Sequence, residues 1–205
     1  MRSTGRRKKS ASPVTANVRR RKQSRPTMRR PSASLEPFTQ LHLSVLSGWL
    51  RWPHVAPWYP APEDNIAWAA DPPEGGSQSL IACDSRPVGY IRWQIVDRET
   101  LDSVGLNDIP TNAVDVDLLL GEPEYLGKGL GPAALELLLG HLRANAALPL
   151  IGLTTSVENA RAHRAFEKAG FRVARQYTPA GFGPCYLFVR PLHHERIPDR
   201  EEAGA

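Results

Sequence analysis

The sequence predicts an α/β fold, a mixed β-sheet flanked by helices within a single domain. Three features support this prediction. Apolar stretches of strand length alternate with helix-like runs from residue 33 onward. Two strand-to-helix units follow one another in the second half, over 113–146 and 150–170. Polar, proline-rich or glycine-rich turns separate these segments, which is the pattern of a sheet covered by helices.

The first half is predicted to hold an edge strand, two helices and a hairpin. Pro37 limits the first strand to an edge or a strand end, because proline cannot donate to a ladder. Thr39 is a favourable N-cap for the helix that follows. The expected elements are a strand from 33, a helix over 40–50, a largely irregular proline-rich segment over 51–65, a short helix over 63–70 and a hairpin over 77–97 that turns at 84–87.

The second half is predicted to alternate strands and helices before a β-rich C-terminus. Gly170 suits the position just after a helix, where the backbone often becomes left-handed. The expected elements are a polar loop over 98–112, a strand over 113–121, a glycine-rich loop, a helix to about 146, a strand over 150–156, a helix over 158–170 and strands within 171–179 and 185–191.

Charge is segregated along the chain. Residues 1–35 contain 12 Lys and Arg and no acidic residue, whereas the remainder contains 14 Lys and Arg against all 21 Asp and Glu. We therefore predict a basic disordered tail over 1–32, one globular domain over 33–192 and a polar C-terminal tail over 193–205. The basic tail has no aromatic residue for base stacking, so any nucleic-acid binding would be non-specific. A solvated tail, or a start at Met28 that keeps every later element, is the favoured interpretation.

Composition argues against a membrane protein, a secreted protein and a metal site. No apolar run approaches the ~20 residues of a membrane span, and the basic N-terminus lacks the apolar segment of a secretory signal. Cys83 and Cys185 match no metal-ligand spacing and are expected to be reduced thiols. We therefore expect a cytoplasmic protein without a metal.

A glycine-rich loop joins the strand at 113–121 to the next helix. In "EYLGKGLGP", Gly127, Gly129 and Gly131 occupy alternate positions, and Lys128 lies between the first two. Backbone N–H groups at a helix N-terminus lack partners and carry the positive end of the helix dipole. Glycines let such a backbone approach a ligand closely. The spacing matches neither common nucleotide-binding pattern, so the loop by itself indicates either an anion site or a plain turn.

Two acidic residues interrupt the apolar strand ahead of this loop. Asp115 and Asp117 alternate with Val114, Val116 and Leu118. Because side chains of a strand point to alternate faces, both carboxylates are predicted to share one face and the valines the other.

Two motifs together resemble the GCN5-related N-acetyltransferases (GNAT). "LGKGLG" resembles the glycine loop with which that family binds the pyrophosphate of acetyl-CoA, and "ENARAHRAFEKAGF" resembles a second family motif. The segments "WLRWPHVAPWY", "RPVGY", "VDVDLLLG" and "YLGKGLG" narrow the resemblance to the aminoglycoside 6′-N-acetyltransferase branch. The resemblance covers roughly residues 33–190. It implies a single GNAT-like mixed sheet in which two central strands splay apart around the acetyl thioester.

The resemblance also implies roles for individual residues. Asp117 is the predicted catalytic residue, since the branch has an aspartate at its position and a carboxylate there can accept a proton from an ammonium. The cosubstrate acetyl-CoA would be bound by Leu126, Gly127, Lys128, Gly129, Leu130, Gly131, Asn159 and Phe166. The amine substrate would contact Trp49, Trp58, Tyr59, Asp115 and Asp117. Packing in a satellite core is the alternative for the three aromatic residues.

Two positions depart from the family pattern. Phe166 stands where many members have a tyrosine that is the proposed acid for the departing thiolate, so another group or water must supply that proton. Thr154 stands where the aminoglycoside branch tends to have an acidic residue that binds the cationic drug, which weakens the case for an aminoglycoside. The loop residues Glu99, Asp102 and Asp108 would make the pocket acidic, or are solvated charges.

The sequence therefore predicts an acetyl-CoA-dependent N-acetyltransferase that acts on a primary amine of a small cationic acceptor, with the 6′-amine of an aminoglycoside as the first choice. Alternatives are a siderophore, lysine or polyamine-type N-acyltransferase and a protein N-acetyltransferase. A non-enzymatic alternative is a module that binds acetyl-CoA or associates with nucleic acid. We expect transfer without an acyl-enzyme, no membrane partner, and a monomer or homodimer.

Overall fold

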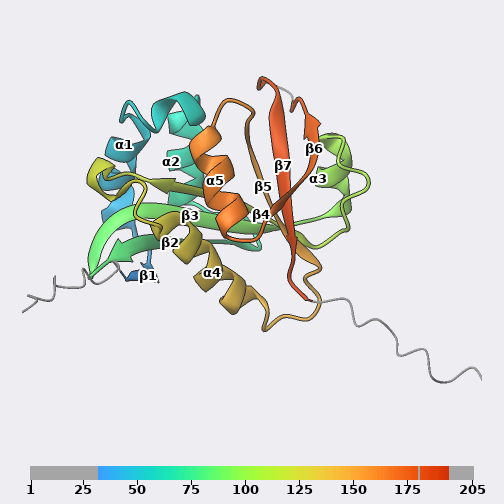
Figure 1. Ribbon diagram of the computed structural model, residues 1–205, viewed down its shortest axis with the longest axis horizontal. Coiled ribbons are helices and arrows are strands. Elements are labelled where there is room, and N and C mark those ends of the chain that lie inside the picture. The colour runs from blue at the N-terminus through green and yellow to red at the C-terminus, as the bar shows by residue number, and fades with distance from the viewer. Residues whose placement is uncertain (1–31, 180, 194–205) are drawn as a thin grey trace, which may run out of the picture.

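The computed structural model describes residues 32–179 and 181–193, which form a seven-stranded sheet with helices around it (Figure 1). The strand order is β1-β2-β3-β4-β5-β7-β6. The elements are β1 (Ala33–Pro37), α1 (Leu43–Leu50), α2 (Pro62–Ala70), β2 (Gly76–Cys83), β3 (Arg86–Val96), α3 (Arg98–Ser103), β4 (Ala113–Leu120), α4 (Leu130–Leu142), β5 (Leu150–Ser156), α5 (Ala160–Lys168), β6 (Arg172–Tyr177) and β7 (Cys185–Pro191).

This architecture confirms the predicted fold class of a mixed sheet flanked by helices. The two predicted tails lie outside the described residues, apart from their inner ends at Ser32 and His193. Within the described ranges, no helix combines the length and the apolar character that a bilayer crossing requires.

The sheet consists of two antiparallel groups that meet along one parallel seam. β1 to β4 form the first group, and β5, β7 and β6 form the second. At the seam β4 and β5 run parallel and pair through Val114 with Ile151 and Asp115 with Gly152. Both strands continue past these pairs without further pairing between them. The splayed central strands implied by the sequence resemblance are therefore present.

Each face of the sheet has its own apolar core. α4 and α5 cross one face (Figure 1), and the main core lies beneath them, with Val114 and Val116 of β4 pointing into it. On the other face, Trp49 of α1 packs with Tyr90 of β3 and Leu119 of β4 in a second core. Because alternate residues of β4 face opposite sides, this second face is also the one that carries the aspartates.

α3 corrects the prediction of a continuous polar loop over 98–112. Asp97 accepts a hydrogen bond from the backbone N–H of Thr100 at 2.8 Å and so caps the start of this helix. Leu101 is buried with Leu106 and Ile109 in a small third core. Three spaced apolar residues in a polar segment were too weak a pattern to predict a helix whose burial depends on contacts with β7. The helix predicted to end near 146 ends earlier, at Leu142.

Gly121 leaves room for the buried ring of Trp49 at the end of β4. Trp49 is 2% exposed, and its Nε1 donates to Glu122 Oε1 at 3.1 Å. A Cβ at Gly121 would overlap this ring. The glycine therefore sets how closely α1 approaches β4, and with it the position of segment 54–59 that follows α1.

We expect Gly121→Ala to lower the free energy of unfolding by about 1–3 kcal/mol, because the added methyl overpacks a filled core. Gly140→Ala is the matched control: it lies on the exposed side of α4, and its Cβ would meet no atom within 4 Å. That control should gain up to about 1 kcal/mol from helix propensity. Urea unfolding of both variants measures the difference, and equal effects would contradict the packing role of Gly121.

Candidate active site

A cavity of about 940 Å³ opens where β4 and β5 diverge. Residues of both strands line it, together with the beginnings of α4 and α5 and the segment that follows α1. A smaller cavity of about 250 Å³ shares Trp68, Arg92, Gln94, Asp115 and Asp117 with it. Because the seam is open here, groups from both faces of the sheet reach one space.

The glycine-rich loop borders this cavity through Leu126 and Gly131. Gly127 and Gly129 have left-handed backbones, with φ of 74° and 86°, and a Cβ at either position would meet no atom within 4 Å. Gly129 is the N-cap of α4; no side chain caps this N-terminus, and the first turn has no acidic residue. The first N–H groups of a 13-residue helix are thus available to an anion. A pyrophosphate fits this arrangement.

The other two residues of the loop have different surroundings. Leu130 is buried in the main core, so its side chain anchors the loop and only its backbone N–H is available to a ligand. Lys128 Nζ lies 5.1 Å from the centroid of the Tyr125 ring. Their predicted contacts with acetyl-CoA stay predictions.

Asn159 and Phe166 lie on α5 at the wall of the cavity. Asn159 is the N-cap of α5: its Oδ1 accepts from the N–H of Ala162 at 3.2 Å, and its Nδ2 donates to Thr155 Oγ1 at 3.1 Å. Phe166 is buried and packs edge-on against Phe188. Both side chains already have structural partners, so their predicted contacts with acetyl-CoA would be made in addition to these.

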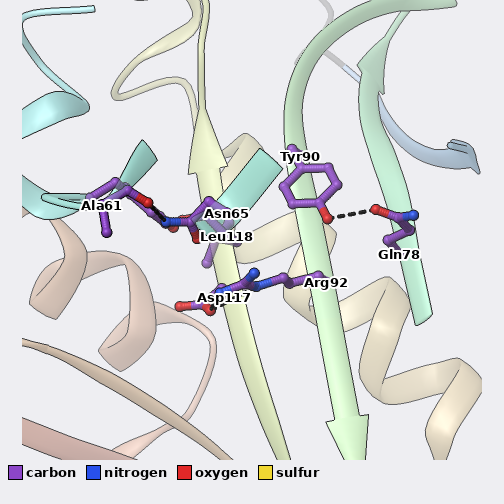
Figure 2. Close-up of polar contacts among 8 residues, drawn as sticks. Ala61, Asn65, Gln78, Tyr90, Arg92, Asp117 and Leu118 are labelled. Carbon is purple, nitrogen blue, oxygen red and sulfur yellow. Dashed lines mark hydrogen bonds and ion pairs between the residues drawn. The ribbon is translucent and has the colours of Figure 1, made fainter. Parts of the chain in front are cut away.

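Asp115 and Asp117 share the face of β4 opposite to Val114 and Val116, as the period-two pattern predicts, and both line the cavity. The register of β3 and β4 places Gln94 opposite Asp115 and Arg92 opposite Asp117. Arg92 donates from Nε at 2.9 Å and from Nη2 at 2.7 Å to Asp117 Oδ2, and Figure 2 shows the two side chains meeting between the strands. The guanidinium also lies over the ring of Trp68, 4.7 Å from its centroid.

The two carboxylates differ in their electrostatic surroundings. Burial, followed by the charge of Asp117, raises the pKa of Asp115 to about 7, against the opposing effects of Arg92 and Gln94. Burial by itself would lower the pKa of Arg92, but the charge and hydrogen bonds of Asp117 outweigh it and raise that pKa. A carboxyl group that titrates near neutrality therefore sits beside a guanidinium that stays charged.

Segment 54–59 satisfies two backbone carbonyls on the open side of β4. The hydroxyl of Tyr59 donates to the carbonyl of Leu118 at 2.9 Å, and His54 Nε2 lies 3.0 Å from the carbonyl of Leu120. Burial, and then the charge of Asp117, raise the pKa of Tyr59 well above its usual value. Tyr59 is thus a neutral donor at the wall of the cavity.

Several predicted substrate contacts are placed differently by the structure. Trp58 and Tyr59 line the cavity, whereas Trp49 is buried in the second core behind it. Of the two alternatives for Trp49, a substrate contact and packing in a satellite core, the structure shows the core packing, against Gly121. Of the loop acids, Asp102 pairs with Arg98 and Asp108 with Arg175, and neither these nor Glu99 line the described cavity.

Sequence reasoning missed Arg92, Gln94, Trp68 and Tyr177. Arg92 and Gln94 alternate along β3 as the aspartates do along β4, which was a usable signal, but the register that pairs them is set by the folded hairpin. The hydroxyl of Tyr177 lies 2.8 Å from Thr154 Oγ1. Nothing in the sequence links these two residues, which belong to different strands and are joined only through β7.

Taken together, the open seam and the uncapped start of α4 can accommodate a long anionic donor that passes through the sheet. The acidic pair on the far face provides for an ammonium acceptor. This arrangement suits an acyltransferase that uses a CoA thioester. The family model described as "Acetyltransferase (GNAT) domain" matches residues 39–178. The chain belongs to this family, and it is an N-acetyltransferase that uses acetyl-CoA.

Relatives and solved structures that match this chain are aminoglycoside acetyltransferases by name. The aminoglycoside N(6′)-acetyltransferase type 1 of Klebsiella pneumoniae is 29% identical over 161 residues, which cover 73% of this chain and 79% of the relative; the enzyme of the same name from Serratia marcescens matches equally. A crystal structure of the aminoglycoside acetyltransferase AAC(6′)-Ib with coenzyme A and kanamycin superposes with a TM-score of 0.67, at 26% identity, over 78% of this chain and 95% of that chain. The structure of AAC(6′)-Ib with paromomycin and acetyl-CoA gives 0.67 at 25% identity, over 78% and 93%.

In the described ranges, no group of three or more His, Cys, Asp or Glu side chains is arranged to hold a metal ion. Cys83 and Cys185 are both buried and are not bonded to one another. Burial raises the pKa of each thiol, which disfavours the thiolate. These observations fit direct transfer from the thioester better than a cysteine-bound intermediate.

We expect Asp115→Asn to stabilise the fold at pH 8 and not at pH 4. The folded-state pKa of Asp115, about 7, exceeds the value of ~3.9 in an unfolded chain. Ionisation therefore costs stability that is absent below pH ~4, grows between ~4 and 7 and stays constant above. The variant should gain about 1–3 kcal/mol at pH 8, measured by urea unfolding at both pH values. An equal gain in the free energy of unfolding at pH 4 and pH 8 would contradict ionisation of Asp115 as the cause. Asp102→Asn, which removes a charge from a surface ion pair, is the control.

Proposed function

We propose that this enzyme transfers the acetyl group of acetyl-CoA to a primary amine of a small cationic molecule, and that the 6′-amine of an aminoglycoside is the leading acceptor. The observation that carries the proposal is the pair of carboxylates, Asp115 and Asp117, at the wall of the cavity beside the diverging strands. An ammonium is bound well by carboxylates that are partly shielded from water.

The charge around the acceptor side of the cavity favours a cation. Asp64 of α2 lines the cavity as well, so Asp64, Asp115 and Asp117 lie with Arg92 on this side, while Arg161 of α5 lines the donor side. Trp58, Tyr59 and Trp68 add flat apolar surface, against which the rings of a sugar or the methylenes of an alkyl chain can pack. The names of the matched relatives and the aminoglycosides in the matched crystal structures point to the same acceptor class.

On the donor side, the backbone of the glycine-rich loop and the start of α4 would hold the pyrophosphate, while Asn159 and Phe166 would border the pantetheine arm. Acetyl-CoA supplies an activated acetyl thioester. Phe166 has no acidic proton, so the departing thiolate is proposed to take its proton from the attacking amine, directly or through water.

A second acceptor class is favoured by Arg92. A guanidinium has five N–H donors, and Asp117 takes two of them. The carboxylate of a lysine-like or siderophore-like amine would accept hydrogen bonds from the remaining donors. Thr154 of β5 is uncharged, whereas the aminoglycoside branch tends to have an acidic residue at this position. Such an acceptor carries its own anion, so it fits the Arg92 side of the cavity better than a polycation does.

Thiol release from acetyl-CoA over a panel of amines distinguishes these acceptors. The panel holds kanamycin, paromomycin, spermidine, lysine and an N-terminal peptide. Paromomycin has a hydroxyl at the 6′ position, so acetylation of kanamycin but not of paromomycin is the expected result for a 6′-amine acceptor. Lysine as the best substrate would replace the aminoglycoside with the second class. Turnover of no member would refute a small cationic acceptor.

We expect Gly129→Asp to weaken the binding of acetyl-CoA at least tenfold relative to Gly129→Asn. Asn and Asp tolerate the left-handed backbone of this position to a similar degree, so the pair differs mainly in charge. A carboxylate at the N-cap of α4 would fill the site and repel a pyrophosphate. Calorimetric titration with CoA measures both affinities. Equal affinities would place the pyrophosphate elsewhere.

A further inference from the structure

Arg92 engages Asp117 through an ion pair. Both hydrogen bonds from Arg92 end on a single oxygen, Oδ2, at 2.9 and 2.7 Å. The Arg92 side chain is only 19% exposed, so its shielded guanidinium depends on Asp117 as its counter-charge. The Asp117 side chain is 37% exposed, and its Oδ1 has no recorded partner in the described part of the chain. Asp117 is therefore placed to bind a further cation through Oδ1.

Asp115 differs, because no ion pair among the described residues involves it and Arg92 affects its pKa only through charge. Its cross-strand partner is Gln94, whose amide opposes the rise in the pKa of Asp115. Burial and the charge of Asp117 bring its pKa to about 7, which suits a general base at neutral pH. The ionisable groups that line the cavity with it are Arg92 of β3, Asp117 of β4, Tyr177 of β6, Cys185 of β7, His54 and Tyr59 of the segment after α1, Asp64 of α2 and Arg161 of α5.

The strand geometry sets the distance over which a proton would move. Asp115 belongs to the last paired position of β4 and β5, with Gly152 opposite, and so lies at the inner end of the opening. Asp117 lies two residues further out on the same face, about 6.7 Å along the strand. One ammonium nitrogen placed between two carboxylates at that spacing can donate to both at roughly 3 Å.

We propose that Asp115 is the proton acceptor of the reaction and that Asp117, fixed by Arg92, holds the acceptor ammonium beside it. The inference rests on the proposed function. It transfers to Asp115 the role that the sequence resemblance implied for Asp117. The acceptor ammonium gives one proton to the Asp115 carboxylate, and its freed lone pair forms the C–N bond at the acetyl carbon. The C–S bond breaks, the nitrogen loses its second proton to the thiolate, and Asp115 returns its proton to solvent.

Each aspartate then has a distinct kinetic signature. Asp115→Asn should lower kcat/KM by about 10²–10⁴-fold and abolish the ascending limb near pH 7 in the pH profile. Asp117→Asn should mainly raise KM, because the ammonium loses a ligand. It should also shift that limb to lower pH, because the charge that raises the pKa of Asp115 is gone. The limb of the pH profile that reports ionisation of the acceptor amine should be the same in all variants. Asp102→Asn, outside the cavity, should leave the profile unchanged.

A direct titration needs no acceptor. With ¹³C-labelled aspartate, the carboxyl signal that Asp115→Asn removes should titrate with a midpoint near 7 in the full chain bound to CoA, and lower in Asp117→Asn. A midpoint below about 5 with active acetylation, or a limb that survives in Asp115→Asn and disappears in Asp117→Asn, would overturn this inference alone. A midpoint near 7 with no amine acetylated would overturn the proposed function, and the assigned role with it.

Discussion

The structure depends on one constraint, the short parallel seam between β4 and β5. Two antiparallel groups of strands meet there and pair through two positions before they diverge. Diverging strands leave backbone groups without sheet partners, and such groups are costly when buried. On β4, Tyr59 and His54 bind two of the freed carbonyls. The segment after α1 is thus tied to the seam, and α1 itself is positioned by the contact between Trp49 and Gly121.

The open seam also explains why donor and acceptor groups come from opposite faces. α4 and its glycine-rich start lie with the main core on one face, and the aspartates lie with the second core on the other. In a closed sheet these groups would be separated by a full layer of side chains. The cavity joins them, so a donor anchored at α4 can present its thioester to an amine held on the far face.

Charge in the cavity is balanced unevenly, and this asymmetry has a chemical use. Arg92 compensates Asp117 through two hydrogen bonds, while Asp115 receives an amide as its partner. Pairing both aspartates with cations would stabilise the fold more but would leave no group able to take up a proton near neutral pH. The stability that Asp115 costs above neutrality is the counterpart of its readiness to accept a proton.

The sequence by itself determined the fold class, the shared face of the two aspartates and the glycine-rich loop, because these follow from local periodicity and backbone preference. α3 escaped prediction because its burial depends on a distant strand. Only the tertiary structure decided that Trp49 fills a core, that Tyr177 meets Thr154, and that Arg92 forms its ion pair with Asp117 and not with Asp115. Those outcomes depend on strand register and on the divergence of β4 from β5, and no single segment encodes either.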